Sequence, residues 1–441
     1  MLEPTGAAAP GIDASGASSV DPTVQEPRST PQRPRMRMVE AFPVQHQGKT
    51  LVCLRDPLGV APDPLVVGVG AYYLTTLFNG ATSLDEIRAA FEQRFQTTLA
   101  PEQLEELVAA LDAAYLLDTP AFAERARRVR DEFLASASRS AAHAGLCYAA
   151  EPEALRAEIA AYFEAAGCAG PSRKAAERSR TPQGLISPHI DPRRGAAAYA
   201  HAYAELMRRE KPELIIILAT SHYGGGPELF AATFKDYETP LGTVPTDAEF
   251  VKRLAGRYRR GDLFVDELLH RQEHSIEFQT LFLAATLGVD GYQVVPILVG
   301  SFYDLVRRAA MPASDGRVSS FLDALGELLA AEKRRTLIIS GVDFAHIGRK
   351  FGDSFGVDGD GVLEDLKRHD LALIETIERG DPVDFFTAVA AEQDRRRICG
   401  LAPMYVQLEL LRGRAGRLLK YGVAVEPETD SAVSYASLVF D

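Results

Sequence analysis

The sequence predicts an α/β protein built on a mostly parallel central sheet with helices on both faces, preceded by a smaller, largely helical domain. Aliphatic runs at 185–187, 214–219 and 336–341 show no alternation with polar residues. This is typical of strands buried on both faces of a parallel sheet. After residue 180, such runs alternate with helical stretches, and this order favours a sheet covered by helices.

The composition is typical of a soluble globular protein. Of the 441 residues, 46% are apolar and 25% are charged, and this length suits two or three domains. The net charge of −13 argues against a nucleic-acid partner or an anionic membrane, because both need a basic face. The four cysteines form no CxxC pair, and we find neither a membrane-spanning run nor a signal sequence. We therefore expect a cytoplasmic protein.

The first part of the chain is expected to hold a tail and a small domain. Residues 1–38 are rich in Ala, Gly, Pro, Ser and Thr, which predicts a disordered tail. The small domain spans 39–119, and Ser83 with Glu86 predicts a capping box at one of its helices. Its strands are expected at 51–56 and 65–67, and its helices at 71–78, 83–95 and 101–117.

Three segments of this small domain carry a resemblance to a known family. Leu74–Gly80, Ser83–Ile87 and Leu111–Leu117 resemble the PqqD-like family, winged-helix domains that recognise leader peptides. The resemblance implies that the domain recruits a peptide or protein, which would add as a strand to a sheet edge. A three-helix accessory domain without a ligand is the alternative.

Residues 120–441 are expected to form the second domain, with its core at 181–441. Residues 120–180 are alanine-rich and helical in pattern. The strands after them are expected at 185–187, 214–219, 230–234, 242–244, 293–299, 336–341, 422–425 and 433–439. The helices are expected at 195–210, 247–258, 275–287, 318–332, 361–379, 382–392 and 404–411.

Three histidines follow the main aliphatic runs. His189, His222 and His346 each come shortly after a predicted strand, and Asp343 lies three residues before His346. Because the carboxyl ends of parallel strands meet at the edge where ligands bind, these residues predict an active or metal site. Taken singly, each histidine is more often structural. Cys399 would by default be a buried apolar thiol; beside histidines it becomes a soft ligand, which suits iron, copper or zinc better than magnesium or calcium.

Two further motifs admit more than one interpretation. Glu273–Glu277 opens a helix in which His274 and Glu277 lie three residues apart, so both could face the site crevice; a salt pair at the helix start is the alternative. Gly224–Gly226 lacks the rest of a phosphate-binding motif, which favours a flexible turn. A nucleophile elbow of the form G-x-S-x-G is missing from the sequence, which disfavours acyl transfer.

Eight segments occur in an order that resembles the Memo family, whose prokaryotic members are called AmmeMemoRadiSam system protein B. The family fold is similar to that of class III extradiol dioxygenases, which are non-haem iron enzymes. The segments are His143–Gly145, Ser187–His189, Ser221–His222, Glu273–Glu277, Val295–Gly300, Asp343–His346, Ile398–Gly400 and Asp430–Ala436.

The resemblance implies roles for individual residues. His189, His222 and Cys399 would bind the metal, with Asp343 and His346 beside it and His346 as the acid/base. Two imidazoles and one anionic ligand would leave metal positions open for dioxygen and substrate. We also expect His274 to contribute to catalysis. The family name implies an AMMECR1-like protein and a radical S-adenosylmethionine enzyme as partners.

This sequence departs from the family pattern at two places. Ile190–Arg194 follows the first histidine where the family usually has Ala-Gly-Tyr, and Tyr223 stands where a second histidine is common. Asp191 could hold a ring nitrogen of a ligand histidine. Arg193 or Arg194 could hold an anionic substrate or face solvent.

The hypothesis from sequence is a Memo-like, metal-dependent redox protein that uses iron(II) or copper. A second hypothesis is a scaffold or binding module that keeps a dioxygenase-like pocket without its chemistry. Cys399 would replace the carboxylate that usually binds the metal in the dioxygenases, and a thiolate alters the reactivity of iron and is itself easily oxidised. A metal-assisted hydrolase is weaker, because tight carboxylate clusters are missing.

Overall fold

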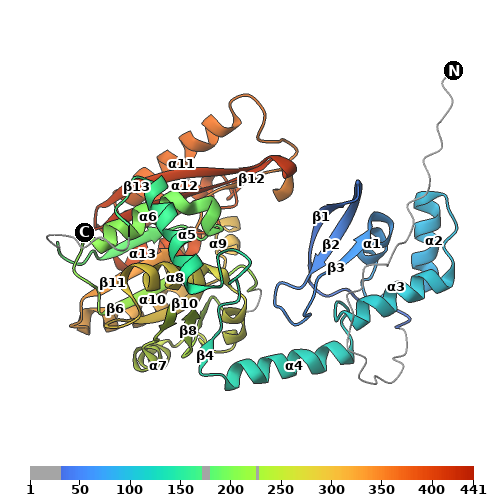
Figure 1. Cartoon of the computed structure of the whole chain (residues 1–441), viewed down its shortest axis with the longest axis horizontal. Helices are drawn as coiled ribbons and strands as arrows, with labels where there is room; N and C mark the ends of the chain where they lie inside the picture. Colours follow the sequence, from blue (N-terminus) through green and yellow to red (C-terminus); the bar gives the residue numbers. More distant parts are fainter. Residues whose placement is uncertain (1–30, 171–178, 225–227) are drawn as a thin grey trace. The chain divides into compact units, whose positions relative to one another are not determined.

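The computed structural model describes residues 31–170, 179–224 and 228–441. Most of the expected tail and two of the three residues of the glycine-rich turn, Gly225 and Gly226, lie outside the described residues. The chain divides into two compact units, Met1–Ala135 and Ser136–Asp441, which are drawn in Figure 1 and described separately here.

The first unit contains a three-stranded antiparallel sheet and four helices. The sheet has the order β1 (Glu40–His46), β2 (Lys49–Arg55), β3 (Leu65–Gly68). The helices are α1 (Val69–Thr76), α2 (Leu84–Phe95), α3 (Pro101–Ala113) and α4 (Pro120–Ala135). Strand β1 was not expected from the sequence, because most of its residues are polar or exposed and it contains Pro43.

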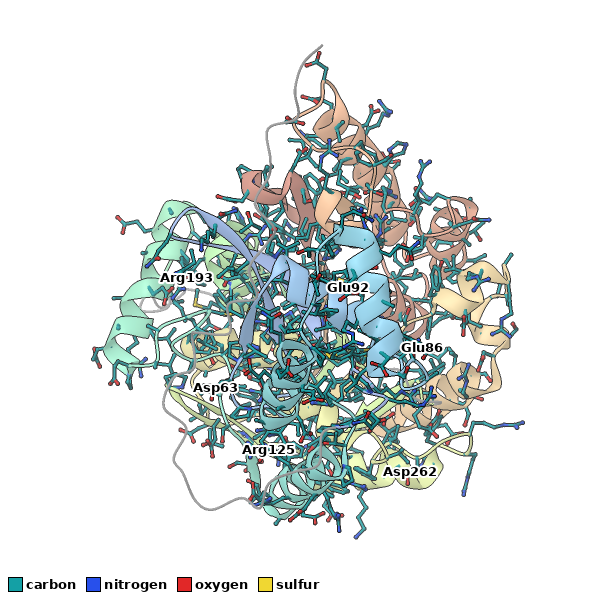
Figure 2. All side chains as sticks on the ribbon, turned by 90° about the vertical axis from the view of Figure 1, so that its right-hand side faces the viewer. Asp63, Glu86, Glu92, Arg125, Arg193 and Asp262 are labelled. Atoms are coloured by element: carbon teal, nitrogen blue, oxygen red, sulfur yellow. The ribbon has the colours of Figure 1, made fainter. Side chains whose placement is uncertain are left out.

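The capping box predicted at Ser83 is present. The Ser83 hydroxyl accepts from the Glu86 backbone N–H at 3.4 Å, and the Glu86 carboxylate accepts from the Ser83 N–H at 2.8 Å. Figure 2 shows Glu86 and Glu92 on α2. Glu92 accepts from the Leu99 N–H at 3.0 Å, so this helix is tied at both ends by its own carboxylates.

Helix α4 lies in the first unit, although residues 120–135 were expected in the second domain. Contacts within the first unit explain the difference. The Arg125 side chain donates to the Val60 carbonyl, and the Arg37 guanidinium lies 3.6 Å from the centre of the Phe122 ring.

The second unit is built on an eight-stranded mixed sheet. Four central strands are parallel in the order β5 (Gly184–Ser187), β11 (Thr336–Gly341), β6 (Leu214–Thr220) and β10 (Gln293–Val299). Strands at both sides are antiparallel: β7 (Phe230–Ala232) on β10, and β14 (Ser431–Phe440) on β5, with β12 (His346–Gly348) and β13 (Gly416–Glu426) both on β14. A mostly parallel sheet was expected, but the sheet is parallel only at its centre. The C-terminal hairpin of β13 and β14 adds antiparallel strands next to β5.

Helices pack on both faces of this sheet (Figure 1). Along β6, Ile215, Ile217 and Ala219 pack into one apolar cluster, while the alternate residues of the strand pack into the other. This double burial explains the unbroken aliphatic run. One cluster includes residues of α5 (Pro152–Ala165), α6 (Pro192–Met207) and α8 (His274–Leu287); the other includes residues of α7 (Ala248–Arg257), α9 (Tyr303–Arg307), α10 (Gly316–Ala331), α11 (Val362–Glu378), α12 (Pro382–Ala391) and α13 (Leu401–Leu410).

A second, small sheet consists of β4 (Ser138–Arg139), β8 (Asp236–Thr239) and β9 (Gly242–Val244). No helix in the described part of the chain is long and apolar enough to span a membrane.

Candidate functional site

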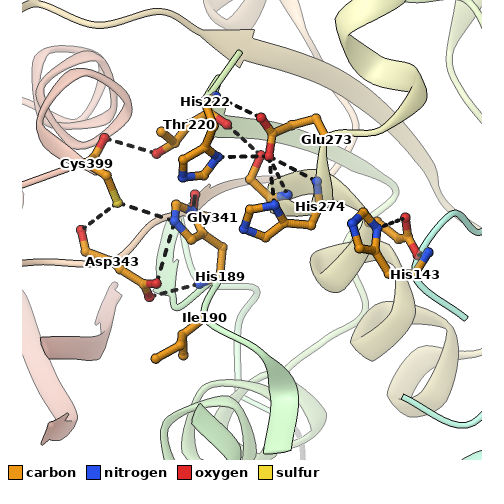
Figure 3. Close-up of polar contacts among 12 residues, drawn as sticks. His143, His189, Ile190, Thr220, His222, Glu273, His274, Gly341, Asp343 and Cys399 are labelled. Carbon is orange, nitrogen blue, oxygen red and sulfur yellow. Dashed lines mark hydrogen bonds and ion pairs between the residues drawn. The ribbon is translucent and has the colours of Figure 1, made fainter. Parts of the chain in front are cut away.

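Three histidines meet at the carboxyl edge of the parallel strands (Figure 3). His189 follows β5, His222 follows β6, and His274 is the first residue of α8. Their candidate ligand nitrogens lie within 4.8 Å of one another. The ring centres of His189 and His222 are 4.8 Å apart, as are those of His222 and His274. The parallel register, in which Ser187 pairs with Gly341 and Gly341 with Ala219, brings these strand ends together.

His189 is buried and held in one orientation. Its Nδ1 lies 2.9 Å from the Gly341 carbonyl oxygen, and because a carbonyl can only accept, Nδ1 must carry the proton. The other nitrogen, Nε2, is then free to accept a proton or to bind a metal. It lies 3.3 Å from the Cys399 Sγ.

One carboxylate holds the other two histidines. Glu273, whose side chain is 1% exposed, accepts from His222 Nδ1 at 3.0 Å and approaches His274 Nδ1 at 3.2 Å. It also accepts from the backbone N–H groups of His222, His274 and Ser275, since it is the N-cap of α8. A carboxylate on Nδ1 orients Nε2 toward a metal, a common arrangement behind metal-binding histidines.

Cys399 and Asp343 complete the group around His189. The Cys399 Sγ lies 3.7 Å from the Asp343 carbonyl, and the Thr220 hydroxyl donates to the Cys399 carbonyl at 3.1 Å. Asp343 accepts from the His189 backbone N–H at 3.1 Å, and its other carboxylate oxygen lies 3.6 Å from His189 Nε2. Gly400 permits this packing, because a Cβ there would lie 2.6 Å from the Asp343 carbonyl oxygen.

The two strand-end histidines of this site differ in pKa. Burial, with the nearby His222 and His274, holds the pKa of His189 well below its usual range. Burial also lowers the pKa of His222, but the charge of Glu273 and a hydrogen bond with the Cys399 thiol outweigh it, so this pKa lies well above its usual range. Despite burial, contacts with His222 and His274 hold the pKa of Glu273 well below its usual range. His222 and Glu273 thus form an ion pair.

Burial affects the acid groups around His189 in the opposite sense. It raises the pKa of Asp343 to about 7, although backbone N–H groups of His189 and Ile190 stabilise the carboxylate. It also raises the pKa of the Cys399 thiol. Burial and the neighbouring charge of His222 lower the pKa of His346 to about 4.

His346 is not one of the three histidines whose candidate ligand atoms lie within 4.8 Å of one another. Its Nδ1 lies 3.2 Å from the Phe344 carbonyl and 3.1 Å from the Arg397 carbonyl, and its ring packs on Phe351. Within the described ranges it forms no hydrogen bond to the other three histidines. The third histidine of the group is His274, from the start of α8, and the role of His346 beside the site stays a prediction.

The helix spacing suggested that Glu277 and His274 could face the same crevice. The structure does not bring Glu277 into contact with the histidine cluster. Its carboxylate is buried among Arg139, His143 and Tyr148 instead. The His143 ring links the two groups, lying 5.8 Å from the His274 ring centre. The carboxylate at the start of α8 that contacts the histidines is Glu273. Its place directly before the predicted helix was the one sign in the sequence that it caps this helix.

The departures after His189 have structural roles. Asp191 caps α6 by accepting from the Arg193 N–H at 2.8 Å. The Nδ1 of His189, a ring nitrogen that Asp191 could have held, donates to the Gly341 carbonyl instead. Arg193 pairs with Glu158 at 3.0 Å, and Arg194 pairs with Glu426. Both arginines are therefore engaged by carboxylates, which weakens the expectation that they hold an anionic substrate.

A family model described as Memo-like protein matches residues 139–439. The chain belongs to the Memo family. A MEMO1 family protein of Aquifex aeolicus is 29% identical over 411 residues, which cover 92% of this chain and all of that protein. One of Thermus thermophilus is 29% identical over 359 residues, covering 81% of this chain and 98% of the relative. The memo-1 homologue of Caenorhabditis elegans is 28% identical over 313 residues, covering 68% and 81%.

The relatives differ in how much of this chain they match. The Aquifex alignment is longer than the part matched by the Memo model, so it must include part of the first unit. The part of the chain that the Memo model matches begins at Arg139, three residues after the start of the second unit. The histidine cluster therefore lies wholly in the Memo part of the chain.

Proposed function

We propose that this Memo-family protein binds a redox-active metal, iron(II) or copper, at His189, His222 and Cys399. The observation that carries the proposal is the convergence of imidazole nitrogens and a thiol at one strand edge, with the opposite nitrogens of the rings held by acceptors. Imidazole with thiolate is a donor set that suits iron, copper and zinc. The residues present thus fit a soft or borderline transition metal.

The surrounding residues would support such a metal in distinct ways. When bound, the metal would supply electron-transfer or dioxygen chemistry that side chains lack. Glu273 would orient His222 and His274 and balance the cationic charge. We assign catalytic roles to Asp343, His346 and His274, with His346 as the acid/base, in line with the family resemblance.

His274 has two possible roles in this proposal. Its candidate ligand nitrogen lies within 4.8 Å of those of His189 and His222, and its side chain is 22% exposed. Replacing it with alanine separates the roles. Loss of metal would make His274 a ligand, whereas retained metal with lost turnover would make it a catalytic residue.

The direct test is metal analysis of anaerobically purified protein. We expect near-stoichiometric iron or copper in the wild type, and little in His189→Ala and His222→Ala. His369→Ala is a suitable control, because this histidine is exposed on α11 and is not one of the three clustered histidines. Metal content that both site substitutions leave unchanged would refute the proposal.

A scaffold without catalysis is the second candidate, and the Cys399 thiol favours it. By the family resemblance, its sulfur would replace the carboxylate that the dioxygenases use; it lies 3.3 Å from His189 Nε2. Thiolates oxidise readily in the presence of a redox metal. Oxygen uptake with catechols and other small anions separates the candidates. Bound metal without turnover of any substrate class supports the scaffold.

For the first unit we propose recruitment of a peptide or protein. Strand β1 is at the edge of the three-stranded sheet, which is the geometry that strand addition requires. The proposed partners are an AMMECR1-like protein, a radical S-adenosylmethionine enzyme, or a substrate of either. Co-purification of the full chain with these two proteins from the source organism tests this, and failure to retain either would count against it. The four unpaired cysteines fit the expected cytoplasmic location.

A further inference from the structure

A short turn, Gln393–Arg397, leads into Cys399 and has an unusual backbone. Three of its five residues, Gln393, Asp394 and Arg397, have positive φ angles of 55°, 49° and 52°. Residues other than glycine, asparagine and aspartate seldom adopt this left-handed conformation, because their Cβ crowds the backbone. Such a conformation persists only where the surrounding contacts impose it, and it is found most often near functional sites.

The contacts that hold Arg397 are made by its own guanidinium group. This group pairs with Asp353 through two hydrogen bonds of 2.8 and 3.1 Å, and it donates to the His346 carbonyl oxygen at 3.2 Å. The Asp353 side chain is 10% exposed, and its carboxylate also accepts from the Gly348 N–H at 2.9 Å. A bidentate pair of this kind fixes direction as well as distance. Arg397 is thus fastened to β12, the strand that begins at His346.

The backbone of the same residue contacts the His346 ring. The carbonyl oxygen of Arg397 lies 3.1 Å from Nδ1 of His346, and the carbonyl oxygen of Phe344 lies 3.2 Å from the same nitrogen. Because both carbonyls can only accept, Nδ1 must carry the proton. Nε2 then carries the lone pair that a general base requires.

The two carbonyls differ in what holds them in place. Phe344 is only two residues before His346, and its N–H donates to the Ser434 carbonyl at 2.8 Å. Arg397 is 51 residues away from His346 along the chain, so its carbonyl meets the ring only through tertiary contacts. The left-handed backbone and the ion pair with Asp353 together set where this carbonyl lies.

We propose that Arg397 is a positioning residue for His346. Its ion pair with Asp353 holds the Arg397 carbonyl against Nδ1, and this carbonyl keeps Nε2 as the nitrogen that takes up a proton. This role rests on the proposed acid/base function of His346, and it adds the residue that decides which ring nitrogen can act.

Nuclear magnetic resonance of the metal-free full chain, with isotope-labelled nitrogen in the histidine rings, tests the proposal at about pH 8, above the usual pKa of histidine. His346→Ala identifies the signals of this ring. In the wild type we expect one tautomer, with the proton on Nδ1 and none on Nε2. Arg397→Ala removes the ion pair, so we expect both tautomers, seen as a shift of the Nε2 signal toward that of a protonated nitrogen.

The matched control is Arg395→Ala, which removes the same charge from an exposed residue of the same turn and should leave the His346 signals unchanged. Asp353→Asn is a second test variant in case Arg397→Ala does not fold. It breaks the ion pair from the other side, keeps an acceptor for the Gly348 N–H, and should shift the Nε2 signal in the same direction.

Two results would overturn the proposal. One is a wild type with its proton on Nε2, and the other is a folded Arg397→Ala or Asp353→Asn protein whose His346 signals match those of the Arg395→Ala control. Because the spectra are recorded without metal, they are independent of the metal analysis. A wild type that binds no metal, combined with the expected shift in the two variants, would refute the metal proposal and support the positioning of His346 by Arg397.

Discussion

Replacing Glu273 with glutamine should weaken metal binding without unfolding the protein. Glutamine keeps the shape and one acceptor oxygen, but it removes the charge that His222 and His274 share. Loss of the partner behind a metal-binding histidine typically costs 10- to 100-fold in metal affinity, which is about 1.4 to 2.8 kcal/mol.

The pH decides where in this range the effect lies. In the wild type, Glu273 holds the pKa of His222 well above its usual range, so a metal must displace a proton from this ring near neutral pH. The glutamine variant lowers the pKa of His222 and removes this competition. We therefore expect a loss of about tenfold near pH 7 and a larger loss, toward a hundredfold, near pH 9, because rising pH weakens the competition by the proton in the wild type.

The assay is competition with a chelator of known affinity for iron(II) or copper, at both pH values. Glu277→Gln is the matched control, because Glu277 is equally buried and one helical turn away but contacts Arg139 and His143 instead of His222. We expect this control to retain wild-type metal affinity. Equal affinities of the Glu273 variant and the wild type at both pH values would refute the orienting role of Glu273.

Three further predictions concern stability. Arg139 and His143 hold the pKa of Glu277 at about 2 despite burial. The stabilisation by this carboxylate is therefore present above about pH 4.5 and is lost as the pH falls toward 2. In urea unfolding, the free energy of unfolding of Glu277→Gln should fall by roughly 3 kcal/mol less than that of the wild type over this pH range. Gly400→Ala should destabilise the protein by about 1–3 kcal/mol, because the new methyl group would meet the Asp343 carbonyl; thermal melting measures this. Ser83→Ala should cost about 0.5–2 kcal/mol in the first unit, through loss of the capping box with Glu86; urea unfolding followed on that unit measures it.

Each of these three has an outcome that would contradict it. Parallel stability curves of wild type and Glu277→Gln between pH 5 and 3 would show that this carboxylate is not selectively stabilised in the folded state. An unchanged melting temperature for Gly400→Ala would mean that the backbone at this position moves freely. Ser83→Thr is the control for the cap, since threonine keeps the hydroxyl, and a Ser83→Ala protein as stable as this control would contradict the role of the cap.

Much of the second unit could be predicted from local pattern. The aliphatic runs correspond to β5, β6, β10 and β11, because a strand covered on both faces needs apolar side chains at every position. The flanking strands were harder to place. Strand β14 was expected at 433–439 and spans Ser431–Phe440, but β13 was expected only at 422–425 of Gly416–Glu426, and the short β12 was not expected.

The sequence by itself determined the Memo-family motifs, the buried strands, and the positions of His189 and His222 at strand ends, because strand periodicity and chain order are local properties. Only the tertiary structure decided which side chains meet. It brought His274 to His189 and His222, packed Glu277 against Arg139 and His143, and made Glu273 the shared carboxylate. The approach of Cys399 to His189 agrees with what the family resemblance had implied. The reason is physical: contacts between distant segments depend on strand register and helix placement, and a motif carries neither.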